Sequence, residues 1–126
     1  MKRLIVAVLF FILAIVICIT GYIVCVDKLN ELNDSLGQAM YVANTENHEN
    51  LIKLTNNIVD DWDEYEKTLG LFISHSEMED INSNIKILTF YAKNKDYDQY
   101  REYCERSIDS SKNVIDSQNL SLKNIF

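Results

Sequence analysis

Five carboxylates stand within seven residues in the segment 60–66, which reads DDWDEYE. Clustered carboxylate oxygens are the ligands that calcium prefers. The segment lacks the D-x-D-x-D-G pattern of a calcium loop, and on a helix its acids spread around the face opposite Trp62 instead of converging. We therefore interpret residues 60–66 as a solvated helix face, with a weak cation site as the alternative.

The two histidines do not complete a metal site. His75 and Glu79 are four residues apart, a spacing at which two side chains of one helix can share a metal, and His48 precedes Glu49. Two ligands do not make a zinc site, and neither H-E-x-x-H nor a paired-cysteine motif occurs. Because His75 falls in a predicted turn, we expect it to cap a helix or make a buried hydrogen bond. We expect no bound metal and no cofactor.

The three cysteines indicate neither a disulfide framework nor a catalytic nucleophile. Cys18 and Cys25 are seven residues apart, which is about 10 Å along a helix and beyond the reach of a disulfide. Both lie in an apolar segment, whereas Cys104 lies on a predicted core stripe as a small buried hydrophobe. A nucleophile needs a neighbouring base, and no glycine-rich phosphate loop is present. We therefore expect that the protein is not an enzyme.

Aromatic side chains supply the remaining candidate site. Tyr97, Tyr100 and Tyr103 of one predicted helix, with Trp62 and Tyr65 of another, can line a ligand pocket between helices. Packing in the core explains these five residues equally well. We favour core packing and keep the pocket as the alternative.

An uncharged segment, Leu4 to Val26, stands before the part of the chain that carries most of these residues. Its 23 residues span about 34 Å as a helix, enough for a hydrocarbon core of about 30 Å. Because the segment is longer than a signal-peptide core and no small-residue cleavage pattern follows it, we predict an uncleaved transmembrane helix. Lys2 and Arg3 precede it, which places residues 1–3 in the cytoplasm and residues 27–126 outside the cell membrane.

Residues 27–126 form an acidic domain with ten basic and 19 acidic residues, a net charge of −9. Phosphate backbones repel such a charge, so we exclude nucleic acid as a partner. The chain has no proline and three glycines, which leaves long stretches free to be helical. The domain is therefore predicted to consist of helices.

Apolar residues recur at spacings of three and four along four segments. The first segment continues the membrane helix to about residue 43, and the second covers about 51–73. The third follows S-x-x-E capping boxes at 74–79 and runs to 92. The last begins at Asp96, and its helical period fades after Gln118. We predict an all-α chain in which the transmembrane helix continues into an extracytoplasmic three- or four-helix up-and-down bundle. The expected core anchors are Trp62, Tyr65, Leu69, Phe72, Ile81 and Leu88. The apolar chain end, at Leu120, Leu122, Ile125 and Phe126, is expected to dock on the protein.

One apolar seam runs from the middle of the membrane segment into the domain. Its members are Cys18, Tyr22, Cys25, Leu29, Leu32 and Leu36. Such a seam can hold a parallel homodimer, contact a membrane partner or pack inside the chain's own bundle. We favour packing inside the chain and leave the dimer open.

Several short features resemble domain-of-unknown-function family 4363. These are the basic start, the single N-terminal span, Trp62, the segment 72–78 (FISHSEM) and the closing residues 124–126 (NIF). The resemblance implies a small anchored protein of spore-forming Gram-positive bacteria, encoded beside multi-span membrane proteins, and hence an accessory subunit. It supplies no catalytic or ligand-binding residue, and Met78 stands where the family is expected to have Ile or Leu.

Together these features predict a membrane-anchored accessory or protein-interaction module that acts with a membrane protein. The alternative is a sensory ectodomain that binds a small ligand or cation between its helices. A cytoplasmic stub of three residues, 1–3, is too short to carry a signal, so a sensor of this kind needs a second membrane protein for its output. That requirement favours the first hypothesis.

Overall fold

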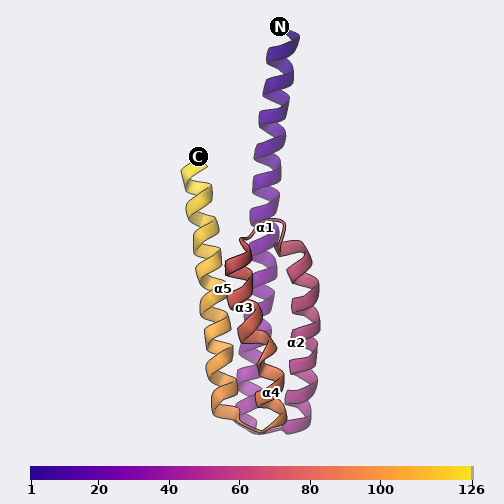
Figure 1. Cartoon of the computed structure of the whole chain (residues 1–126), viewed down its shortest axis with the longest axis vertical. Coiled ribbons are helices and arrows are strands. Elements are labelled where there is room, and N and C mark those ends of the chain that lie inside the picture. Colours follow the sequence, from indigo (N-terminus) through magenta and orange to yellow (C-terminus); the bar gives the residue numbers. More distant parts are fainter. Residues whose placement is uncertain (126) are drawn as a thin grey trace.

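The computed structural model describes residues 1–125, which form helices and no strand (Figure 1). The helices are α1 (Lys2–Thr45), α2 (His48–Leu69), α3 (His75–Lys86), α4 (Leu88–Lys93) and α5 (Tyr97–Ile125). α3 and α4 lie end to end and together form one column of the bundle. With α1, α2 and α5 they make four columns that run up and down side by side. α1 packs against α2 and α5, and the α3–α4 column closes the bundle between them. The expected all-α bundle is confirmed, with four columns.

Short polar side chains mark where three of the helices begin. The side chain of Asn47 accepts a hydrogen bond from the amide three residues further on at 3.3 Å, at the start of α2. Ser74 does the same for α3 at 3.3 Å, and Asp96 for α5 at 3.4 Å. Each bond satisfies an amide that has no partner within the first turn of its helix. The predicted caps at Ser74 and Asp96 are therefore present, and Asn47 caps α2.

The core lies along the axis of the bundle and receives one stripe from each column. Its fully buried members on the first two helices are Cys25, Leu29, Leu36, Ala39, Ala43, Leu51, Trp62 and Leu69, and on the others Ile81, Ile85, Leu88, Ala92, Tyr100 and Cys104. Four of the six expected anchors, Trp62, Leu69, Ile81 and Leu88, are in this set. Tyr65 is half-buried against the core, and its hydroxyl donates to Glu31 Oε2 at 2.9 Å.

Phe72 does not anchor the core, contrary to the prediction. α2 ends at Leu69, so Phe72 falls in the turn before α3 instead of on the α2 stripe. Its ring covers Gly21 of α1, and 36% of the residue remains exposed. The prediction fails because an apolar residue that continues a helical period loses its place in the stripe once the helix ends.

Two helix boundaries also differ from the prediction. The third predicted helix is interrupted at Ile87. There the hydrogen bond from the Ile87 amide to the Ser83 carbonyl is 3.4 Å long. α5 does not fade after Gln118 but continues to Ile125. Because the hydroxyl of Tyr22 donates to Asn119 Oδ1, α1 supports this extension of α5.

The expected docking of the apolar chain end can be followed only in part. Leu122 is half-buried beside α1, whereas Leu120 is exposed. The side chain of Ile125 and the whole of Phe126 lie outside the described residues. Of the four residues expected to dock, Leu122 packs beside α1 and Leu120 does not dock.

The first part of α1 stands free of the bundle (Figure 1). Between Leu4 and Thr20 nearly every side chain is exposed, and packing begins at Gly21. Within residues 1–125, α1 is the helix that is long enough and apolar enough to cross a membrane. It continues without a break from this apolar part to Thr45 at the far end of the bundle.

Candidate functional site

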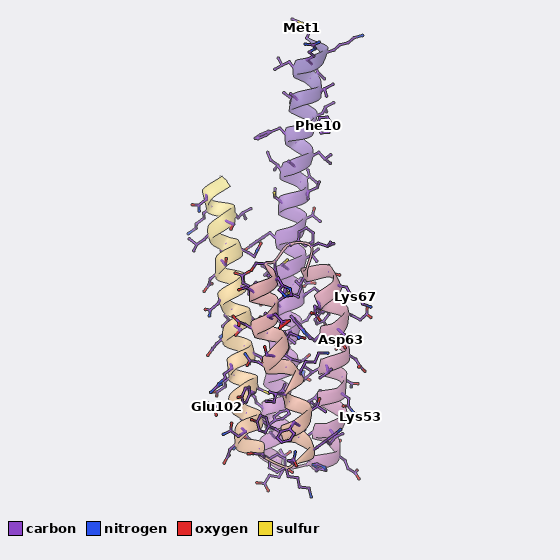
Figure 2. The ribbon with its side chains drawn as sticks, viewed as in Figure 1. Met1, Phe10, Lys53, Asp63, Lys67 and Glu102 are labelled. Carbon is purple, nitrogen blue, oxygen red and sulfur yellow. The ribbon has the colours of Figure 1, made fainter. Side chains whose placement is uncertain are left out.

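The acidic segment 60–66 lies on α2 with most of its carboxylates in solvent. Asp63, labelled in Figure 2, pairs with Lys86 of α3 at 2.5 Å, and Glu64 pairs with Lys67 at 3.3 Å. Among residues 1–125 no three His, Cys, Asp or Glu side chains gather closely enough to hold a metal ion. The acids therefore interact with solvent and with the chain's own lysines.

His75 does not have the role expected of it. His75 is the first residue of α3 and is exposed, while the hydroxyl of Ser74 makes the cap. The prediction that His75 caps a helix or makes a buried hydrogen bond is wrong, because the capping position falls one residue earlier. His48 is half-buried at the start of α2, and its Nδ1 has no hydrogen-bond partner in the described part of the chain.

A buried polar pair joins α2 to α5. The Tyr100 hydroxyl and Thr55 Oγ1 are 2.6 Å apart, and Thr55 Oγ1 also donates to the Leu51 carbonyl at 2.6 Å. A threonine hydroxyl has one proton, so Tyr100 must be the donor in the pair. Burial raises the pKa of Tyr100 above its usual value, which keeps the donor protonated. The pair holds two helices together in the core.

Cys104 lies one helical turn after Tyr100 and is fully buried. Burial raises the pKa of its thiol to about 12. A nucleophilic cysteine needs a lowered pKa and access to its substrate. The Cys104 thiol is therefore protonated at neutral pH and sealed in the core.

The aromatic residues expected to line a pocket do not gather around one hollow. Trp62 is fully buried, and its Nε1 donates to Asn82 Oδ1 at 3.0 Å. Tyr103 stacks on Tyr91, with ring centroids 5.3 Å apart, at the α4–α5 contact. Trp62 and Tyr100 therefore fill the bundle interior, while Tyr103 and Tyr91 pack half-buried against the core.

The seam predicted on α1 divides where the helix enters the bundle. Cys25, Leu29, Leu32 and Leu36 are buried under α2 and α5, whereas Tyr22 is half-buried and Cys18 is exposed. The seam therefore packs within the chain from position 25 onward. A parallel dimer through Cys25 would require the bundle to open.

A polar groove lies on the surface between α3 and α5. Its volume is about 400 Å³, and it is lined by Asp80, Ser83, Asn84, Arg106, Asp109, Ser110 and Asn113. Arg106 donates to Glu102 Oε1 at 2.7 Å and lies 4.7 Å from the centroid of the Tyr103 ring. The groove carries both signs of charge and several amide groups, which suits a polar protein surface.

Another hollow lies where α1 leaves the bundle. Its volume is about 240 Å³, and it is lined by Cys18, Gly21, Tyr22, Phe72, Gln118, Ser121 and Leu122. Sequence reasoning missed this contact because it joins three segments that are far apart in the chain. One local signal was available: Leu71 and Phe72 are two large apolar residues in a turn directly before a capping box.

Comparison with protein families gives one match. A family model described as "Domain of unknown function (DUF4363)" matches residues 21–125, from the point where α1 enters the bundle to the end of α5. Comparison with curated proteins and with solved structures finds no match. The resemblance drawn from Trp62, the segment 72–78 and the chain end is confirmed by this match, and the chain belongs to the DUF4363 family.

Proposed function

We propose that this chain is a membrane-anchored interaction module whose bundle contacts another membrane protein. α1 crosses the cell membrane once, with residues 1–3 in the cytoplasm and the bundle outside. The observation that carries the proposal is the continuity of α1, one helix of 44 residues from Lys2 to Thr45. The segment able to cross a membrane and the first helix of the bundle are the same helix.

This continuity gives the bundle a fixed position. The chain has no proline, and no turn separates the free part of α1 from the packed part, so one continuous helix joins them. From Gly21 to Thr45 the helix rises about 37 Å, which sets the height over which the bundle can meet a partner. A protein that held its bundle on a flexible linker would not fix this height.

The orientation follows from the charges beside the apolar segment. Lys2 and Arg3 precede it, and all 19 acidic residues follow it. Positive charge is retained on the cytoplasmic side during insertion, while acidic residues have little effect. This arrangement supports an extracytoplasmic bundle.

A binding role fits the bundle better than a catalytic or sensory one. The thiol of Cys104 is sealed in the core, and Trp62 and Tyr100 occupy the interior that a ligand between the helices would need. What the bundle offers is its outer surface, including the polar groove between α3 and α5. We therefore assign recognition to the surface of the bundle.

Photocrosslinking in the native membrane tests this function. A photoreactive amino acid is placed singly at exposed groove positions Ser83 and Asn113, and at exposed α2 positions Asn57 and Asp60 as matched controls. We expect one membrane protein to be crosslinked from the groove positions and not from the α2 positions. If both faces give only a diffuse background, the proposed interaction is wrong.

A further inference from the structure

Exposed large apolar side chains of the bundle concentrate at the end from which α1 emerges. Beyond residue 26, five large hydrophobic residues are exposed in the described chain: Tyr41, Leu71, Phe72, Phe90 and Leu120. Three of them lie at this end, with Leu71 78% and Leu120 62% exposed. Together with the half-buried Leu122, the residues Leu71, Phe72 and Leu120 are named the apolar collar.

The collar lies beside the part of α1 that belongs to the apolar segment. A Cβ atom placed on Gly21 would lie 2.5 Å from the Phe72 ring, so the α2–α3 turn rests directly on α1. On the other side Leu122 lines the same hollow as Cys18, and the last turns of α5 run alongside the free part of α1 (Figure 1). Phe72 and Leu122 of the collar therefore flank α1 at the level of residues 18–22.

This end of the bundle differs in charge from the rest of the domain. The segments that form it, 70–76 and 117–124, contain no acidic residue and a single lysine, Lys123, although the chain has 19 acids. A lysine can keep its ammonium group among lipid headgroups while its carbon chain lies in an apolar layer. These two segments therefore place no acidic side chain of their own against an anionic bilayer.

The length of the free part of α1 sets the level of the bilayer surface. Leu4 to Thr20 are 17 residues and span about 25 Å, less than a hydrocarbon core of about 30 Å. The missing length falls on residues 21–23, where Ile23 is 59% exposed on the outer side of α1. The hydrocarbon boundary therefore coincides with the collar.

We propose that the apolar collar is a second membrane contact, in which Leu71, Phe72, Leu120 and Leu122 enter the leaflet on the side of the bundle. The inference rests on the proposed membrane span of α1. The occupant of this surface is the phospholipid bilayer, because the collar is continuous with the span, lies at its level and lacks acidic residues. Tyr22 fits the same level, since tyrosines favour the membrane interface. The bundle then stands on the bilayer, which fixes its tilt as well as its height.

Spin labels on the full-length protein in vesicles of phosphatidylcholine and phosphatidylglycerol test this contact. The background carries Cys18→Ala, since Cys25 and Cys104 are buried. Labels are placed at Leu71→Cys and Leu120→Cys. Phe90→Cys is the matched control, because Phe90 is 60% exposed but lies on α4 toward the opposite end of the bundle. The measurement is the ratio of collisions with oxygen, which concentrates in lipid, to collisions with a water-soluble nickel chelate.

The expected result is a higher oxygen-to-nickel ratio at positions 71 and 120 than at position 90. Equal ratios at the three positions would place the collar in water and overturn the proposal. Low collision rates with both reagents at 71 and 120 would show that protein covers the collar, which also overturns it. A further label at Phe10→Cys separates the two proposals: if that label is in lipid while the collar is in water, only the second contact is wrong. If the label at position 10 is itself in water, the membrane span and the proposed function fail.

Discussion

Replacing Trp62 by alanine tests how much of the bundle's stability comes from its largest core side chain. Trp62 is fully buried, and its Nε1 donates to Asn82 Oδ1 at 3.0 Å. Removing a buried tryptophan side chain costs about 3–5 kcal/mol through lost apolar contacts and the cavity that remains. Asn82 is half-buried, so water can replace the lost hydrogen bond and little is added to this figure. Because a domain is stable by about 5–15 kcal/mol in total, Trp62→Ala should remove a large part of that stability.

The assay is urea denaturation of the full-length protein in mild detergent micelles, followed by far-ultraviolet circular dichroism. The detergent-covered part of α1 stays helical, so the change in signal reports the bundle. Phe90→Ala, at a residue that is 60% exposed, is the control and should change the free energy of unfolding by no more than about 0.5 kcal/mol. A loss below about 1 kcal/mol for Trp62→Ala would refute the placement of α2 in the core.

The remaining predictions concern single residues of the bundle. Tyr100→Phe removes the donor of the buried bond to α2 and should lower the free energy of unfolding by about 1 kcal/mol in the same urea assay; no change would mean that the hydroxyl is solvated. The thiol of Cys104, whose pKa is raised to about 12 by burial, should not react with maleimide at pH 8 until denaturant unfolds the bundle, as followed by peptide mass spectrometry. The pKa of the Cys104 thiol is higher in the folded protein than in the unfolded chain, so burial of this thiol stabilises the fold fully below about pH 9 and less as the pH rises toward 12. The Cys104→Ala variant should therefore lose less stability at alkaline pH than the unchanged protein. Gly37→Ala should stabilise α1 by up to about 1 kcal/mol, because no atom lies within 4 Å of the new methyl group. Gly21→Ala should give less, because its methyl group would meet the Phe72 ring at 2.5 Å, and equal gains at both glycines would contradict that contact.

Local signals in the sequence were sufficient to predict that the chain is helical and where α3 and α5 begin. Asn47, Ser74 and Asp96 begin helices because short polar side chains satisfy the free amides of a first turn, an interaction that spans three residues. The apolar period likewise identifies the buried face of each helix, as at Trp62 and Leu88. These features depend only on near neighbours in the chain.

The features that sequence reasoning missed depend on contacts between distant segments. α5 continues past Gln118, where Asn119 accepts a hydrogen bond from Tyr22 on α1. No local pattern links positions 97 residues apart. The placement of Phe72 failed for a related reason, since the end of α2 three residues earlier turns this side chain onto Gly21. The break at Ile87 has neither proline nor glycine to mark it.

The candidate site was predicted less well than the fold. The acidic segment 60–66 lies in solvent as expected, whereas the collar at the end of the bundle was not foreseen. Exposure of an apolar residue in a turn is a property of the assembled bundle, because the sequence of Leu71 and Phe72 alone also fits a buried turn. The apolar collar, which two separate segments form, is therefore visible only in the structure.

Protease treatment of intact cells, stripped of their wall, tests the central claim most directly. The full-length chain carries an epitope tag after Phe126, and a cytoplasmic protein of the same cells serves as the control for membrane integrity. The account predicts that external protease removes the tag while the control protein survives. Changing Lys2 and Arg3 to Glu should protect part of the tagged population, because the positive charge that sets orientation is gone. A tag on the unchanged chain that stays protected until the membrane is dissolved would contradict the proposed topology.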